Sequence, residues 1–205
     1  HKGFNDKYAD PNRDLYYVNS LKAAYAEIKK ANPNARVIAL GMKDVDLRFA
    51  EGVFRLGGLE YCDGISCHPY DWAGGFDENI ALKSMLDLKE LLKTYGHEND
   101  RPVWVTEVGF SVFDGPVASK PAYPGYTQRS QANANVLMNT LFKAYNACDR
   151  MIEYCFYDVL SEKEEVERRG GFLHSWITDD DGAPRNGTKE SYLAIAAMNK
   201  FVGGY

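Results

Sequence analysis

The sequence has little of what marks a membrane, metal-binding or nucleic-acid-binding protein. None of its 205 residues belongs to an apolar run of eighteen, so we expect no helical membrane span. Its four cysteines show no CxxC or CxxH spacing, and we predict neither a metal nor a cofactor. The net charge of −5 argues against nucleic acid and anionic membrane surfaces as partners. Neutral ligands or protein surfaces fit this composition better.

The chain also lacks a starting methionine and an apolar signal segment, since its first residues read HKGFNDKYADPNRD. We therefore expect the sequence to begin inside a longer polypeptide. No repeat, linker or low-complexity segment divides it, and its length suits one domain. Aromatic residues, by contrast, are plentiful at 13%, with fourteen tyrosines. Such rings suit sugar binding, although they fill protein cores equally well.

Helical and strand-like patterns alternate along the chain. Apolar residues at helical spacing predict five helices, over Asp14–Lys30, Asp46–Leu56, Asn79–Tyr95, Thr127–Tyr145 and Lys189–Phe201. Short apolar runs predict four buried strands, over Arg36–Gly41, Gly64–His68, Pro102–Thr106 and Met151–Tyr157. The alternation is typical of a parallel sheet, and the lack of a GxGxxG turn favours a barrel over a doubly wound sheet. A closed (β/α)8 barrel needs eight strands, twice the number found here.

Candidate functional residues stand at the carboxyl ends of all four strands, where parallel barrels carry their active sites. The runs are GMKD at 41–44, CHPYDW at 67–72, TEVGF at 106–110 and FYD at 156–158. Strand alternation puts Val103, Val105 and Glu107 on one face. We interpret that face as the barrel interior, with the Glu107 carboxylate at its mouth. A salt bridge or a metal ligand is the ordinary alternative for such a glutamate.

Ordered segments over nearly the whole chain resemble the second half of clan A glycoside hydrolases, which are retaining barrel enzymes. Residues 59–70 (LEYCDGISCHPY) are similar to the sixth strand of that clan, which ends in His-x-Tyr. Residues 102–110 (PVWVTEVGF) resemble its seventh strand, where Thr-Glu-x-Gly carries the nucleophile. Residues 153–158 (EYCFYD) look like the eighth strand, and GFL at 171–173 and KESY at 189–192 resemble the turn and helix that follow it.

The resemblance implies an α/β fold in which residues 1–205 form the C-terminal part of one (β/α)8 TIM barrel, strands five to eight, with the N-terminal half absent. It implies a retaining O-glycoside hydrolase acting on β-linked poly- or oligosaccharides, secreted or periplasmic at full length, with Glu107 as the nucleophile. The clan places its acid/base glutamate, usually as Asn-Glu, at the end of the fourth strand. That segment would lie upstream of His1, so the fragment alone is expected to be inactive.

The resemblance also implies roles for five substrate-binding residues. Tyr70 resembles the tyrosine that hydrogen-bonds the nucleophile, and His68 resembles the histidine that contacts sugar hydroxyls or Glu107. Phe156 or Tyr157 stands where the clan usually has a tryptophan platform, which is a departure from the pattern. Trp72, on a loop, is a candidate for lining an outer subsite, with ordinary packing as its alternative.

Two other functions compete with hydrolysis. One is a non-catalytic carbohydrate-binding half-barrel or pseudoenzyme, which an Asn-Glu just upstream of His1 would argue against. The other is a metal-dependent barrel enzyme, disfavoured because only His68 among four histidines is well placed. A half-barrel alone would expose two edge strands. We therefore expect it to pair with its missing half or to form a homodimer through those edges.

Overall fold

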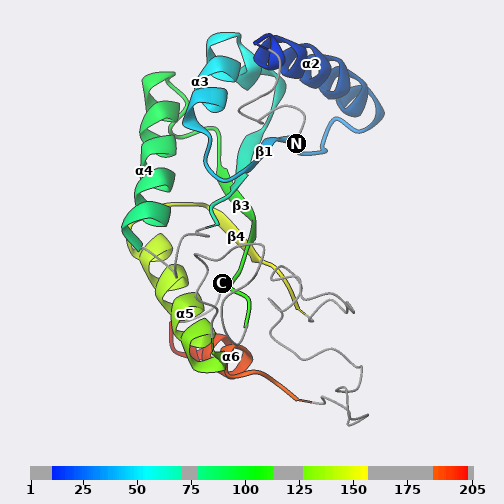
Figure 1. The fold of residues 1–205 in the computed structure, drawn as a ribbon. Coiled ribbons are helices and arrows are strands. Elements are labelled where there is room, and N and C mark those ends of the chain that lie inside the picture. Colours follow the sequence, from blue (N-terminus) through cyan, green and yellow to red (C-terminus); the bar gives the residue numbers. More distant parts are fainter. Residues whose placement is uncertain (1–10, 71–77, 113–126, 157–186, 203–205) are drawn as a thin grey trace. The chain divides into compact units, whose positions relative to one another are not determined.

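Helices and strands alternate along the chain in the predicted order (Figure 1). The computed structural model describes residues 11–70, 78–112, 127–156 and 187–202. The elements are α2 (Arg13–Ala31), β1 (Ile38–Lys43), α3 (Leu47–Arg55), the 3-10 helix η1 (Gly58–Tyr61), β2 (Gly64–His68), α4 (Glu78–Thr94), β3 (Val103–Val108), α5 (Gln128–Ala144), β4 (Arg150–Glu153) and α6 (Glu190–Val202).

The described residues fall into two compact units. One contains residues 11–70, 80–107 and 146–152, and therefore nearly all of the sheet. The other contains residues 78–79, 108–112, 127–145, 153–156 and 187–202, including α5 and α6. No helix in the described ranges is both long and apolar enough to cross a membrane.

The four strands form one sheet in the order β1-β2-β3-β4, which is also their order along the chain. β2 is parallel to β1 on one side and to β3 on the other. A helix or helices connect each strand to the next. Because the order never reverses, the sheet lacks the switch point of a doubly wound fold and is consistent with part of a (β/α)8 barrel.

One face of the sheet packs against α4. The Sγ of Cys67 in β2 lies 3.4 Å from the Sδ of Met85 in α4. In the parallel register Cys67 pairs with Val105 and Ile65 pairs with Val103, so all four side chains point to this face, and each is at most 1% exposed. The prediction that Val103 and Val105 line the barrel interior is therefore wrong. Apolar character alone does not orient a strand that is covered on both sides.

The first strand begins and ends two residues later than predicted, and it contains a β-bulge. The register between β1 and β2 shifts between Leu40 and Met42, and both Leu40 and Gly41 have positive φ angles, of 73° and 56°. A bulge adds a residue to one strand and turns the side chains that follow it. Here it carries β1 on to Lys43.

Two aspartates repeat the same pair of hydrogen bonds at the amino ends of neighbouring strands. Asp63 donates its N–H to the carbonyl of Val37 (2.7 Å) and accepts the Val37 N–H at Oδ2 (2.8 Å). Asp149 does the same with Val103, at 2.8 Å for each bond. Asp63 directly precedes β2 and Asp149 directly precedes β4, so each pair of bonds sets where that strand starts beside its neighbour.

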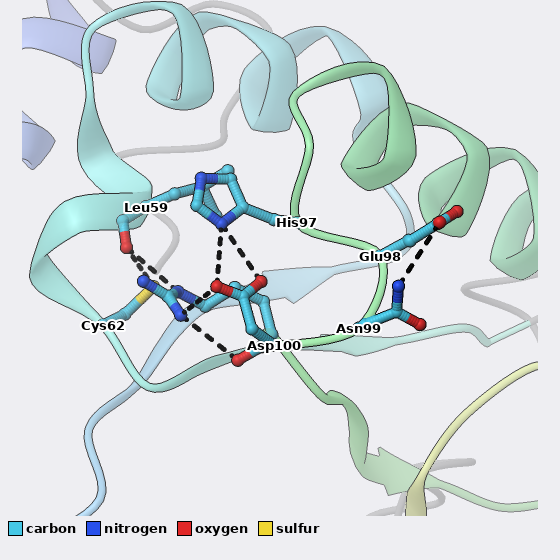
Figure 2. Close-up of polar contacts among 7 residues, drawn as sticks. Leu59, Cys62, His97, Glu98, Asn99 and Asp100 are labelled. Atoms are coloured by element: carbon cyan, nitrogen blue, oxygen red, sulfur yellow. Dashed lines mark hydrogen bonds and ion pairs between the residues drawn. The ribbon is translucent and has the colours of Figure 1, made fainter.

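A charged cluster connects the loop before β3 to η1 (Figure 2). Arg101 donates from Nε to the carbonyl of Leu59 (3.1 Å) and from Nη1 to Asp100 Oδ2 (2.9 Å). His97 Nδ1 lies 3.1 Å from the other oxygen of Asp100. The cluster lies at the amino end of β3, the end opposite to Glu107, and we assign it a structural role.

In the second unit, α5 packs against α6 through a buried polar chain. Gln131 donates from Nε2 to the carbonyl of Phe110 (2.5 Å) and accepts at Oε1 from the hydroxyl of Ser191 (2.9 Å). Both side chains are fully buried. Thr127 caps the start of α5 by accepting the Ser130 N–H, as the predicted helix boundary required.

Candidate active site

Three side chains meet at the carboxyl ends of β2 and β3. The Tyr70 hydroxyl donates to Glu107 Oε1 at 2.7 Å. His68 Nδ1 lies 3.7 Å from the other carboxylate oxygen, Oε2, which is beyond hydrogen-bond distance. The Glu107 side chain is 39% exposed and therefore accessible to a ligand from solvent.

The parallel register explains why these groups meet. Cys67 pairs with Val105, so the next residues along, His68 and Thr106, stand side by side on adjacent strands. Their side chains are in contact, with His68 Nε2 3.1 Å from Thr106 Oγ1. Glu107 is the penultimate residue of β3, and Tyr70 lies two residues beyond the end of β2, where its phenol reaches the carboxylate.

Burial lowers the pKa of His68 below its ordinary value. The negative charges of Glu107 and Asp44 act in the opposite direction and offset part of that effect. His68 is therefore neutral at neutral pH, with one ring nitrogen donating and the other accepting.

β1 also contributes to the site, through Asp44 just after its end, a residue to which sequence reasoning assigned no role. Its N–H donates to the carbonyl of His68 at 3.0 Å, and its backbone has a positive φ of 61°. Non-glycine residues adopt that conformation rarely, and aspartate is among the more tolerant. The bulge at Gly41 lengthens β1 so that Asp44 ends beside His68. A left-handed residue after a strand leaves no clear pattern in sequence.

Among the predicted site residues, the structure brings Glu107, His68 and Tyr70 together. Phe156 is 55% exposed just after β4 and belongs to the other unit. Trp72 and Tyr157 lie outside the described residues. The described ranges contain no group of three or more histidines, cysteines or carboxylates that would hold a metal ion.

All four cysteines are free thiols. Cys67 is buried, whereas Cys155 is only half-buried. Burial raises the pKa of Cys62 to about 11, as it does for Cys148. These thiols are therefore protonated at neutral pH and are poor nucleophiles.

Comparison with known proteins identifies the fold. No protein-family model matches the sequence, and no curated protein is significantly similar to it. The chain is similar in structure to a family 39 glycoside hydrolase from Bacteroides cellulosilyticus WH2, with a TM-score of 0.70, 24% identity, and coverage of 98% of this chain and 40% of that one.

Two further solved structures share the fold at lower identity. A GH2 β-galacturonidase from Eisenbergiella tayi has a TM-score of 0.62 and 14% identity, over 93% of this chain and 31% of its own. A β-glucuronidase from Lactobacillus rhamnosus has a TM-score of 0.59 and 17% identity, over 93% and 30%. The chain thus has the fold of a part of these glycoside hydrolases and spans 40% or less of their length.

Proposed function

We propose that the chain forms strands five to eight of a (β/α)8 barrel in a retaining β-glycoside hydrolase, with Glu107 as its nucleophile. The contact between Tyr70 and Glu107 carries the proposal, since it places an oriented carboxylate at the carboxyl ends of two parallel strands. The similarity in fold to three glycoside hydrolases supports it.

In the first chemical step, a Glu107 oxygen forms a bond to the anomeric carbon as the bond to the leaving oxygen breaks. The electron pair of that bond stays with the leaving oxygen, which takes a proton from a second carboxyl group. Water then attacks the glycosyl ester, gives its proton to the second carboxyl group and releases Glu107. We place that acid/base group upstream of His1, as the resemblance implies.

The two oxygens of Glu107 have different surroundings, so one can be held in place while the other attacks the anomeric carbon. Oε1 accepts the short hydrogen bond from Tyr70, and that bond stabilises the ionised carboxylate. Among the described residues Oε2 accepts no hydrogen bond, and His68 Nδ1 lies 3.7 Å from it. We assign the attack on the anomeric carbon to Oε2.

The proposed substrate is a β-linked oligo- or polysaccharide. Phe156, which is 55% exposed, would offer the sugar a smaller aromatic face than the tryptophan that the clan usually places there. We also propose, from the resemblance, that Tyr157 and Trp72 contact the sugar and that the full-length protein is secreted or periplasmic.

In the described residues the sheet has two edge strands, β1 and β4, and apolar side chains in β4 and just after it are partly exposed. Ile152 is 51% exposed and Tyr154 38% exposed. We propose that the N-terminal half of the barrel covers this edge in the full-length protein, or that a second copy covers it in the isolated chain. Light scattering on the isolated chain tests this point, and a stable monomer would contradict it.

The nucleophile is tested by Glu107→Gln in the full-length protein, assayed on aryl β-glycosides. The variant should lose at least a thousandfold in kcat, whereas Glu98→Gln, on the exposed loop before β3, should leave activity unchanged. A 2-deoxy-2-fluoro glycoside should label the wild-type protein at Glu107, as detected by peptide mass spectrometry. Retained activity in Glu107→Gln would overturn the assignment. Sugar binding without turnover in the wild type would favour a carbohydrate-binding half-barrel.

A further inference from the structure

Thr106 contacts the site histidine at the ring nitrogen that Glu107 does not face. Its Oγ1 lies 3.1 Å from His68 Nε2, while His68 Nδ1 points to Glu107 Oε2 at 3.7 Å. The ring is thus held between a hydroxyl on one side and a carboxylate on the other. Only one of the two neutral tautomers suits both neighbours.

The carboxylate determines which tautomer is favoured. An ionised carboxylate only accepts hydrogen bonds, so an unprotonated Nδ1 would direct its lone pair at the negative oxygen. A protonated Nδ1 instead presents the positive end of the N–H dipole to Oε2. Nε2 must then be the acceptor, which leaves the Thr106 hydroxyl as the donor of the 3.1 Å bond.

We propose that Thr106 is a positioning residue that holds neutral His68 in the Nδ1–H tautomer, with that N–H directed at Glu107. The tautomer follows from the geometry of the three side chains, whereas its catalytic consequence rests on the proposed function. Thr106 has a hydroxyl to donate, and a valine of the same shape in its place would have none. We therefore expect the hydroxyl of Thr106, rather than the packing of its side chain, to stabilise the His68 tautomer.

The consequence concerns the attacking oxygen. The Nδ1–H supplies a weak, long-range attraction that holds Oε2 in place without covering it, since 3.7 Å is too long for a hydrogen bond. The opposite tautomer would repel Oε2 and would leave the Thr106 hydroxyl as an acceptor. The Glu107 carboxylate thus selects the Nδ1–H tautomer, and the Thr106 hydroxyl stabilises it by donating to the ring nitrogen that this tautomer leaves as an acceptor.

Nitrogen-15 NMR of the histidine side chains measures the tautomer directly, because long-range proton couplings differ between protonated and unprotonated ring nitrogens. The His68 signals are assigned by their loss in His68→Gln. The wild type at neutral pH should show the Nδ1–H form, Thr106→Ser should keep it, and Thr106→Val should shift the population towards Nε2–H. An Nε2–H form in the wild type, or an unchanged spectrum in Thr106→Val, would overturn the proposal. If Thr106→Val does not fold, the wild-type spectrum alone decides.

Kinetics of the full-length protein on aryl β-glycosides separate this proposal from the proposed function. Thr106→Val should lower kcat about tenfold with little change in KM, and Thr106→Ser should recover most of that loss. If Glu107→Gln is inactive but His68 of the wild type is in the Nε2–H form, only the role of Thr106 is refuted. If Glu107→Gln is active and His68 of the wild type is in the Nδ1–H form, Glu107 is not the nucleophile, but the assigned tautomer is correct. A higher KM with an unchanged kcat for Thr106→Val would contradict the positioning role.

Discussion

The Tyr70 hydroxyl donates a 2.7 Å hydrogen bond to Glu107 Oε1 across two adjacent parallel strands. A phenol that donates to a carboxylate stabilises the charge and fixes the oxygen that accepts it. The same bond also restrains the rotamer of Glu107. The side chain is 39% exposed, so packing alone would restrain it less. The position of the nucleophilic oxygen therefore depends on Tyr70, just after β2, as much as on β3 itself.

Tyr70→Phe removes this bond and keeps the ring. Hydrogen bonds to charged groups are worth about 1.5–3 kcal/mol, so kcat/KM of the full-length protein should fall roughly ten- to a hundredfold. Tyr145→Phe, in which the altered tyrosine is 58% exposed at the end of α5, is the matched control and should keep full activity. Equal activity for Tyr70→Phe and the wild type would show that the bond has no catalytic role.

Gly109 follows β3 in a position that has no room for a side chain. A Cβ added there would lie 2.0 Å from the carbonyl oxygen of Tyr154, closer than any contact that real Cβ atoms make. Gly109→Ala should therefore push the backbone near residue 154 away and destabilise the protein by about 1–3 kcal/mol. Urea unfolding measures this loss, and an unchanged midpoint would show that the two segments separate without cost.

Much of the fold could be predicted from sequence, because alternating helical and strand-like patterns reflect local structure. The starts of α3 and α5 were found for the same reason, since Asp46 and Thr127 cap their own helices. The interior face of β3 could not be predicted, because Val103 and Val105 look the same against α4 as they would inside a barrel.

The residues of the candidate site likewise divide into those that the sequence predicts and those that depend on the tertiary structure. Glu107, His68 and Tyr70 stand out in sequence because polar residues at the ends of apolar strands are conspicuous. Thr106 does not, since its role depends on which residue of β2 lies beside it, and a register is a property of two strands. The contribution of Asp44 depends on the bulge at Gly41, three residues earlier, between Leu40 and Met42.

Asp63 should stabilise the protein at neutral pH and lose that effect in acid. Burial alone would raise its pKa, but the hydrogen bonds from Lys29 and from the Val37 N–H outweigh burial, and the pKa is lowered. A carboxyl with a lowered folded-state pKa stabilises the fold above its unfolded-state pKa, and the effect disappears as the pH falls through the folded-state value.

Asp63→Ala should thus lower the free energy of unfolding at pH 7 by about 1–2 kcal/mol and change it less at pH 3. Asp149→Ala is the matched variant, because Asp149 makes the same two bonds with Val103. Asp63 has in addition an ion pair with Lys29 at 2.8 Å, so its loss should be the larger. Equal losses at both pH values would contradict the role of ionised Asp63.

Glu153 should have the opposite pH dependence. Its Oε1 accepts a 2.6 Å hydrogen bond from Asn139 Nδ2, whereas its Oε2 is shielded from solvent and has no hydrogen-bond partner in the part of the chain that the structure describes. Burial raises the pKa of this carboxyl to about 7, and the Asn139 bond only partly opposes that effect. The folded state therefore keeps a proton on Glu153 that the unfolded chain releases near pH 4.5.

A raised folded-state pKa in an acid gives stability that is complete below the unfolded-state value and declines as the pH rises towards 7. The decline should amount to roughly 2–3 kcal/mol between pH 4.5 and 7.5. Glu153→Gln, a neutral mimic of the protonated side chain, should remove this part of the pH dependence and stabilise the protein at pH 7.5.

Glu27→Gln is the control, because the Glu27 side chain is 75% exposed on α2 and forms a long ion pair with Lys30, at 3.7 Å. It should leave the dependence of stability on pH unchanged. Urea unfolding of the three proteins at pH 4.5, 6 and 7.5 tests the expectation. If Glu153→Gln destabilises the protein equally at all three values, Glu153 is ionised in the folded state and its second oxygen has a partner that only a charged carboxylate can hold.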